Sequence, residues 1–177
     1  MVAWVSIWRA RIEVASVDDN STHVLTISRE YPHALGVVWE ACTKPEALTH
    51  WFGPEHAPAT FFVADVRPGG KWRAGLHVGD SQAPLYVSGR YLAIDPPSRL
   101  VYSFRWEGDT HEDGPGTDTE VTMTFEALSV RRTRVTLRQV GLRSTLSQQG
   151  HEQGWESCLL RLEKYLSRCD AQPAVQA

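Results

Sequence analysis

With 177 residues, the chain is long enough to form one domain that buries a core without disulfides or metal ions. Its formal net charge of −3 gives no general attraction to nucleic acid or to an anionic membrane, so we expect neither as a partner. No stretch is apolar for long enough to span a bilayer. The three cysteines form no C-x-x-C pair, and we therefore expect reduced thiols and a cytoplasmic protein.

The N-terminal segment lacks the charge order of a secretory signal peptide, because Arg9 follows the apolar residues rather than preceding them. Trp4 and Trp8 either belong to a short amphipathic piece that docks on the domain or on a partner, or to a mobile extension. The predicted division of the chain is an extension over residues 1–20, one domain over residues 21–170 and a tail over residues 171–177.

Alternating polarity and β-branched residues predict a first strand over residues 23–30. Apolar residues then recur at helical spacing from Leu35 to Cys42, which predicts a short helix. The segment T-K-P-E at residues 43–46 has the pattern of a capping box and predicts the start of a second short helix. The Gly-Pro pair at residues 53–54 ends that helix.

From residue 60 onward, the spacing of apolar residues changes from helical to alternating. Turn signals rich in Gly, Pro and Asp separate the alternating runs, and short connections between consecutive strands favour antiparallel pairing. The further strands that we predict cover residues 61–66, 71–78, 85–94, 100–106, 119–128 and 133–140.

The longest periodic stretch, residues 144–169, predicts a C-terminal helix on the order of 35 Å long. A T-x-x-Q pattern at residues 145–148 indicates its start. Gly150 and Gly154 each cost roughly 1 kcal/mol relative to alanine. They indicate either close packing of the helix on a sheet or a ligand that passes over the backbone. The apolar face of this helix consists of His151, Trp155, Cys158, Leu159, Leu162, Tyr165, Leu166 and Cys169.

This order of elements predicts an α+β fold. A curved antiparallel sheet of about seven strands grips the long C-terminal helix, and two short helices follow the first strand.

Four segments resemble a known superfamily. They are residues 43–54 (TKPEALTHWFGP), 65–73 (DVRPGGKWR), 89–97 (GRYLAIDPP) and 151–166, the last with His151, Gly154, Trp155, Tyr165 and Leu166. On these segments the chain resembles the SRPBCC superfamily, also called START-like, Bet v 1-like or helix-grip, and within it the branch named after the activator of Hsp90 ATPase. The superfamily places lipid carriers, hormone receptors, polyketide cyclases and chaperone regulators on one scaffold, so the resemblance implies a fold rather than one activity.

The resemblance also implies a cavity between the terminal helix and the concave sheet, roofed by the two short helices. Ligand pockets are mostly apolar with a few placed polar groups. Periodicity is equally compatible with a solid core in which the same aromatic side chains fill this space. The candidate ligand-binding residues are Trp39, Trp51, Phe52, Trp72, His77, Tyr102, Phe104, Gln139, His151, Trp155 and Leu159, of which His77, Gln139 and His151 are the polar tips.

No motif predicts a metal ion, a cofactor or a catalytic set. His151 and Glu152 begin like the zinc motif H-E-x-x-H, but Trp155 stands where the second histidine belongs. The loop over residues 109–120 has the acid spacing of a calcium loop, but His111 replaces a ligand and predicted strands flank it.

Three functions are compatible with these features. We rank first the non-enzymatic binding of a small apolar or amphipathic molecule in the cavity, by a monomer or homodimer, because binding requires only the cavity. The second is an interaction module of the Hsp90-activator type, which would bind a chaperone or another protein through its surface and stimulate a chaperone ATPase. The third is a cofactor-free polyketide cyclase or hydrolase, for which His77, His151, Asp65 or Arg105 are candidate proton-transfer groups.

Overall fold

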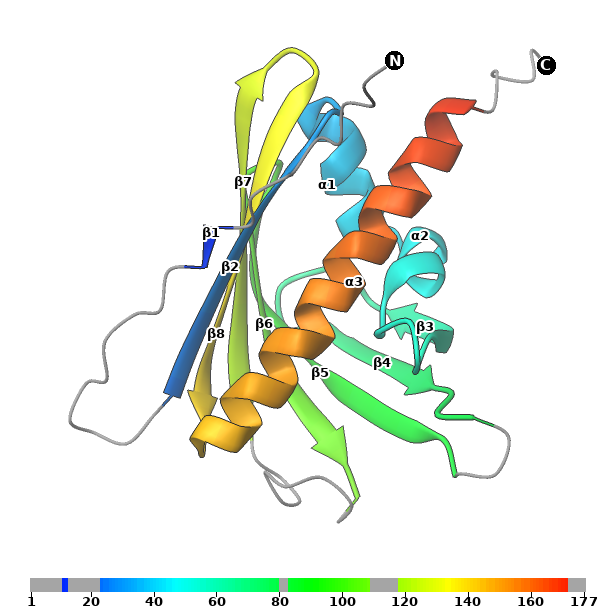
Figure 1. The fold of residues 1–177 in the computed structure, drawn as a ribbon, viewed down its shortest axis with the longest axis vertical. Coiled ribbons are helices and arrows are strands. Elements are labelled where there is room, and N and C mark those ends of the chain that lie inside the picture. The colour runs from blue at the N-terminus through cyan, green and yellow to red at the C-terminus, as the bar shows by residue number, and fades with distance from the viewer. Residues whose placement is uncertain (1–10, 13–22, 80–82, 109–117, 172–177) are drawn as a thin grey trace, which may run out of the picture.

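The computed structural model describes residues 11–12, 23–79, 83–108 and 118–171. These residues form a curved antiparallel sheet with a long helix across its concave face and two short helices beside that helix (Figure 1). The strands are β1 (Arg11–Ile12), β2 (His23–Tyr31), β3 (Ala59–Ala64), β4 (Lys71–Leu76), β5 (Leu85–Asp95), β6 (Arg99–Glu107), β7 (Thr119–Ser129) and β8 (Arg132–Leu142). The helices are α1 (Leu35–Thr43), α2 (Pro45–Trp51) and α3 (Thr145–Ala171).

The predicted α+β helix-grip fold is confirmed. The strands lie in the order β1-β2-β8-β7-β6-β5-β4-β3, so the first long strand pairs with the last one. Strands β2 to β8 correspond to the predicted ones, and β1 adds two residues at the edge beside β2. The rest of the predicted N-terminal extension and the loop that resembles a calcium site lie largely outside the described residues.

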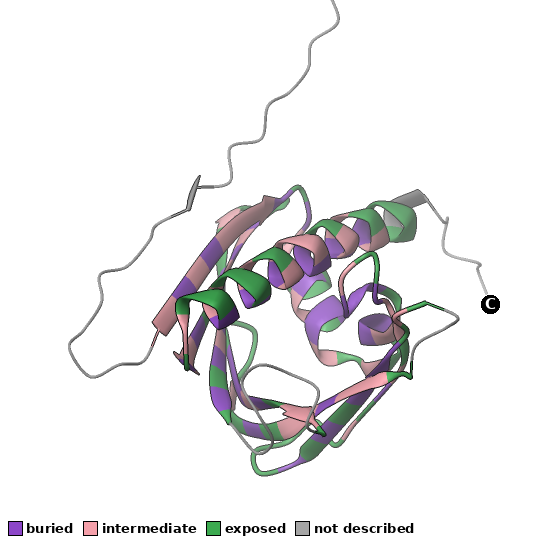
Figure 2. Ribbon diagram, turned by 60° about the horizontal axis from the view of Figure 1, so that its bottom comes forward, coloured by how far each residue is buried: buried purple, intermediate pink, exposed green. Residues whose placement is uncertain are grey.

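Alternation along the strands separates the two faces of the sheet. On β7, for example, Val121, Met123 and Phe125 are buried, whereas Glu120 and Thr124 between and beside them are exposed. Figure 2 shows this alternation along the strands. Because successive side chains of a strand point to opposite faces, each long strand contributes both to the core under α3 and to the outer surface.

Helix α3 buries most of its predicted apolar face; Tyr165 is half-buried and Cys169 is exposed. Its start differs from the predicted capping box. The hydroxyl of Ser144, one residue earlier, accepts the N–H of Ser147 at 3.0 Å. The side chain of Gln148 instead donates to the carbonyl oxygen of Val24 at 2.7 Å and so ties the helix to β2. None of the described helices combines the length and the apolar character required to cross a membrane.

The connection between α1 and α2 also differs from the predicted capping box. Lys44 stands between the two helices and makes no side-chain cap, while the hydroxyl of Thr43 donates back to the carbonyl oxygen of Trp39 at 2.8 Å. Pro45 occupies the first position of α2, where its missing N–H costs nothing. The indole N–H of Trp51 donates to the carbonyl oxygen of Ala41 at 2.8 Å and fixes the two helices together.

Candidate functional site

Aromatic side chains from the helices and the sheet meet between α3 and the concave face. The ring of Phe52, which follows α2, lies 5.1 Å from that of Phe62, 5.9 Å from that of Trp72 and 5.9 Å from that of Trp155, measured between centroids. Phe62 and Trp72 stack with an interplanar angle of 3°. Edge-to-face and offset contacts of this kind are the preferred geometries of aromatic pairs. The predicted cavity residues therefore form a packed cluster.

The void at the centre of this cluster has a volume of about 10 Å³. That is close to the smallest space that holds one water molecule. At this position the aromatic side chains therefore form a solid core. The described residues around it enclose no open cavity. Those residues are Cys42, Leu48, Trp51, Phe52, Phe62, Trp72, Tyr91, Leu100, Tyr102 and Met123.

Gln139 belongs to a chain of hydrogen bonds inside the sheet. The indole N–H of Trp155 donates to Oε1 of Gln139 at 2.7 Å, and Nε2 of Gln139 donates to the hydroxyl of Thr119 at 2.8 Å. That hydroxyl donates in turn to the carbonyl oxygen of Phe104 at 3.0 Å. Gln139 is fully buried, and buried polar groups require such partners. The network holds the Trp155 ring in place between α3 and β8.

His151 is buried near the start of α3, with both ring nitrogens engaged. Its Nε2 accepts the indole N–H of Trp106 at 3.2 Å, and its Nδ1 lies 2.9 Å from the carbonyl oxygen of Ser147, to which it donates. Together these bonds define the neutral imidazole with the proton on Nδ1. The ring also lies edge-on to Phe104 at 5.8 Å. His151 thus extends the aromatic cluster toward the α3 N-terminus.

The remaining sequence-predicted residues occupy different surroundings. Trp39 is half-buried and packs edge-on against Phe125 of β7 at 5.1 Å, and His77 is exposed just beyond β4. Asp65 and Arg105, considered as proton-transfer groups, are also exposed. Of the four residues proposed for catalysis, the structure therefore places His151 in the interior and the other three at the surface. The other nine candidate ligand-binding residues, Trp51, Phe52, Trp72, Tyr102, Phe104, Gln139, His151, Trp155 and Leu159, are buried.

Gly154 on α3 has open space beside it. A Cβ atom built at this position would meet no neighbouring atom within 4 Å. Close packing on the sheet therefore does not explain this glycine.

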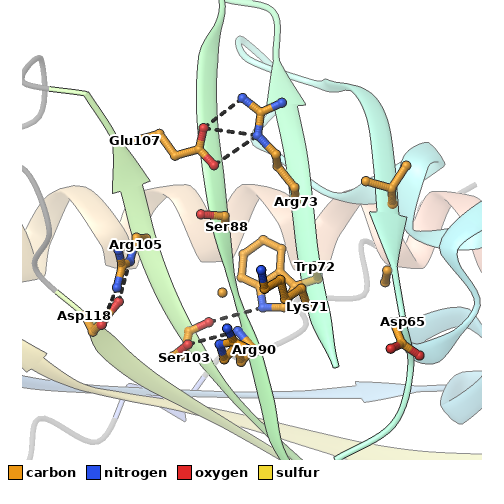
Figure 3. Close-up of a pocket in the computed structure, with 13 residues that line it drawn as sticks. Asp65, Lys71, Trp72, Arg73, Ser88, Arg90, Ser103, Arg105, Glu107 and Asp118 are labelled. Atoms are coloured by element: carbon orange, nitrogen blue, oxygen red, sulfur yellow. Dashed lines mark hydrogen bonds and ion pairs between the residues drawn. The ribbon is translucent and has the colours of Figure 1, made fainter. Parts of the chain in front are cut away.

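A groove with a volume of about 720 Å³ lies on the opposite, outer face of the sheet (Figure 3). It crosses β3, β4, β5 and β6 and reaches the start of β7, with α3 behind the sheet in this view. Its volume is in the range of ligand sites, but it is an open surface groove, and most of the residues that line it are polar or charged. The residues that line it are Val63, Ala64, Asp65, Lys71, Trp72, Arg73, Ser88, Gly89, Arg90, Ser103, Arg105, Glu107 and Asp118.

The floor of the groove is an interruption in the pairing of β5 with β6. The pairing passes from Ser88↔Arg105 directly to Tyr91↔Tyr102. Between these two residue pairs, the Ser103 hydroxyl accepts the N–H of Arg90 at 3.0 Å. The backbone carbonyl oxygen of Ser103 accepts the indole N–H of Trp72 at 3.2 Å.

Gly89 lies at this interruption, opposite Trp72 in the pairing of β4 with β5. A Cβ atom on Gly89 would overlap the carbonyl oxygen of Ser103 and the indole nitrogen of Trp72. The glycine therefore allows the strands and the Trp72 ring to approach this closely.

Two ion pairs flank the groove. Nε and Nη2 of Arg73 donate to the Glu107 carboxylate, the latter at 2.8 Å, and these bonds lower the pKa of Glu107. Nε and Nη2 of Arg105 donate to the two carboxylate oxygens of Asp118 at 2.7 and 2.6 Å, and this pairing raises the pKa of Arg105. Such two-donor contacts are the strong form of the arginine–carboxylate pair.

The centre of the groove carries two cations. Lys71 on β4 lies directly opposite Arg90 on β5 in the strand register, and both side chains are exposed. Nη1 of Arg90 donates to the carbonyl oxygen of Gly69 at 3.2 Å. Nearby, the Asp65 carboxylate pairs with Arg67 at 2.8 Å.

Sequence reasoning missed the groove because it followed the apolar positions of each strand. The available signal was the presence of charged or hydroxyl residues at alternate positions within parts of these strands: Lys71 and Arg73 on β4, Ser88 and Arg90 on β5, and Ser103, Arg105 and Glu107 on β6. That pattern marks one polar face, but the register between strands decides which of these residues become neighbours.

Comparisons with known proteins agree with this architecture. A model of the family described as "Activator of Hsp90 ATPase homolog 1-like protein" matches residues 33–167. No curated protein matches the chain.

Three solved structures illustrate the likeness in fold. A protein from Arthrobacter aurescens has a TM-score of 0.73 at 23% identity, covering 96% of this chain and 94% of that one. A protein from Nitrosomonas europaea has a TM-score of 0.70 at 22% identity, covering 88% and 100%. The AHSA1 protein from Silicibacter pomeroyi has a TM-score of 0.69 at 23% identity, covering 81% and 97%. Because the family model spans most of the chain, this protein belongs to the AHSA1-like family, as its sequence segments indicated.

Proposed function

We propose that this AHSA1-like protein is a non-enzymatic interaction module that binds a partner protein in the outer-face groove. The observation that carries the proposal is the contrast between the two sites, a void of about 10 Å³ inside the aromatic cluster and a groove of about 720 Å³ on the outer face. A drug-sized ligand requires a site of roughly 300–1,000 Å³. The family description names an activator of a chaperone ATPase, so an Hsp90-class chaperone is the first partner to test.

Photo-crosslinking from the groove tests this function directly. A benzophenone amino acid replaces Val63, which lines the groove and is 57% exposed, and a control carries it at Val130, which is 89% exposed between β7 and β8. With a purified Hsp90-class chaperone we expect crosslinks from position 63 and not from position 130. Crosslinks of equal yield from both positions, or from neither, would contradict groove binding by this chaperone.

A variant that leaves the charges of the groove unchanged tests whether the groove is required to stimulate the chaperone ATPase. Ser88→Trp places a large side chain between Arg73 and Arg105 without changing the charges of the groove. The wild-type protein should raise the ATPase rate of the chaperone, and this variant should not. Ser167→Trp, at an exposed position on α3, is the matched control and should behave like the wild type.

Binding of a small apolar or amphipathic molecule between α3 and the sheet is the second candidate function. The position of Phe52 favours this candidate, because its ring enters the aromatic cluster from the end of α2. Arg161 on α3 binds the backbone at this end of α2. Withdrawal of α2 would remove this ring from the cluster and create space. Native mass spectrometry of gently purified protein tests this candidate. A stoichiometric apolar molecule would support it, and an empty protein whose Phe52→Ala variant also fails to take up apolar molecules would count against it.

A further inference from the structure

We propose that the centre of the groove recognises the carboxylates of an extended acidic segment of the partner, held between Lys71 and Arg90. This inference rests on the proposed function, because it takes the groove as the partner-binding site. It adds the chemistry by which the partner is recognised.

The first argument is the arrangement of like charges. Lys71 and Arg90 are direct cross-strand neighbours on the outer face. Like charges directly opposite each other destabilise a pair of strands. Among the described residues, no carboxylate forms an ion pair with either cation, and the nearby carboxylate of Asp65 is engaged by Arg67. A bound anion between the two cations would compensate for this repulsion.

The second argument is that carboxylates already fit this surface. The two neighbouring arginines each hold a carboxylate of the chain itself through two nitrogen donors, Arg73 that of Glu107 and Arg105 that of Asp118. These pairs leave the central cations as the uncompensated charges of the groove. Carboxylates of a partner would thus repeat a contact that two neighbouring arginines of the groove already make.

The third argument concerns shape and the remaining donors. The groove crosses four strands and lies open on the outer face, so it suits an extended segment better than a small molecule that must be enclosed. The hydroxyl of Ser103 lies in the same groove and accepts the N–H of Arg90, which leaves its own hydrogen available to donate. Because the whole chain has a net charge of −3, this basic centre is a local feature rather than part of a general basic surface.

Fluorescence anisotropy with the full-length protein tests the inference. The probe is fluorescein-labelled hexaglutamate, and the matched probe is hexaglutamine. We expect hexaglutamate to bind in low-salt buffer, to bind more weakly as salt is added, and hexaglutamine not to bind. The double variant Lys71→Glu/Arg90→Glu should lose about tenfold or more in affinity.

The matched control is Arg143→Glu/Arg168→Glu, which changes the net charge equally at exposed positions outside the groove. It should bind hexaglutamate like the wild type, and circular dichroism should show both double variants folded. Absence of hexaglutamate binding, or an equal loss in both double variants, would overturn the inference. Inorganic phosphate that binds as tightly as hexaglutamate would overturn it as well, in favour of a site for small anions. Crosslinking from Val63 to the chaperone uses no acidic probe, so it decides the proposed function separately.

Discussion

Arg161 on α3 holds the end of α2 through backbone carbonyl oxygens. Its Nη1 donates to the oxygens of Phe52 and Gly53 at 2.9 and 2.6 Å, and its Nη2 donates to that of His50 at 3.0 Å. Three hydrogen bonds from the guanidinium thus satisfy carbonyls at the C-terminus of a helix, where cations are favoured. This single residue links the two helices on either side of the aromatic cluster.

We therefore expect Arg161→Ala to lower the free energy of unfolding by roughly 1–3 kcal/mol, because it removes hydrogen bonds from a charged donor. Lys164 on the same helix forms an exposed ion pair with Glu55, and Lys164→Ala should cost less than about 0.5 kcal/mol. Urea unfolding of both variants measures the difference. Equal small losses would mean that Arg161 does not hold α2 in place.

Glu107 provides a prediction about pH. Hydrogen bonds from Arg73 hold its pKa below the usual value for glutamate. The carboxylate therefore adds stability above the unfolded-state pKa of about 4.3, and this contribution is lost as the pH falls through the lower folded-state pKa. Glu107→Gln should be less stable than the wild type by up to about 1 kcal/mol at neutral pH, and the gap should close as the pH falls through the lowered pKa of Glu107. Urea unfolding across this range checks the sign, and a gap that widens in acid would contradict it.

At the scale of the elements, β4 and β5 combine a tight inner contact with a repulsive outer one. On the inner side, Trp72 passes beneath Gly89 and reaches the backbone of β6. On the outer side, Lys71 faces Arg90. Here the Trp72 indole and the Ser103 hydroxyl bind backbone groups of β6 and β5 that would otherwise pair with each other. This interruption of the pairing forms the floor of the groove.

Removal of one central cation should therefore stabilise the free protein. We expect Lys71→Gln to raise the free energy of unfolding by about 0.2–1 kcal/mol, because it relieves the like-charge contact with Arg90. Lys71→Arg keeps the charge and should give no such gain. Thermal unfolding without any peptide measures both variants, and a loss of stability in Lys71→Gln would show that the cations do not repel each other here.

At the scale of the whole molecule, one sheet separates two kinds of surface. The concave face, covered by α3, holds the aromatic cluster, and the outer face holds the charged groove (Figures 1 and 3). The same strands supply both, because their residues alternate between the faces. A change on the outer face of β4 can therefore alter the groove while the packed cluster stays intact, and this separation makes the surface variants informative.

The sequence by itself determined the elements, their order and the inner face of each one. The predicted strands and the terminal helix match the observed ones closely, and Trp155, Leu159 and Leu162 are buried as the helical spacing required. These features depend on periodicity and turn chemistry, which act over a few neighbouring residues. The capping predictions for α2 and α3 were wrong for different reasons. At α3 the hydroxyl of Ser144, one position earlier, caps the helix, whereas α2 begins after Lys44 with Pro45 and has no side-chain cap.

The tertiary structure decided the two properties on which function depends. Whether the aromatic side chains leave a cavity depends on how the volumes of residues from several elements add up, and the described residues around the void between α2 and the sheet leave about 10 Å³. Whether Lys71 meets Arg90 depends on the register between two strands, which a shift of one residue would change. Both are relations between residues distant in the chain or on separate strands, and local patterns do not determine them.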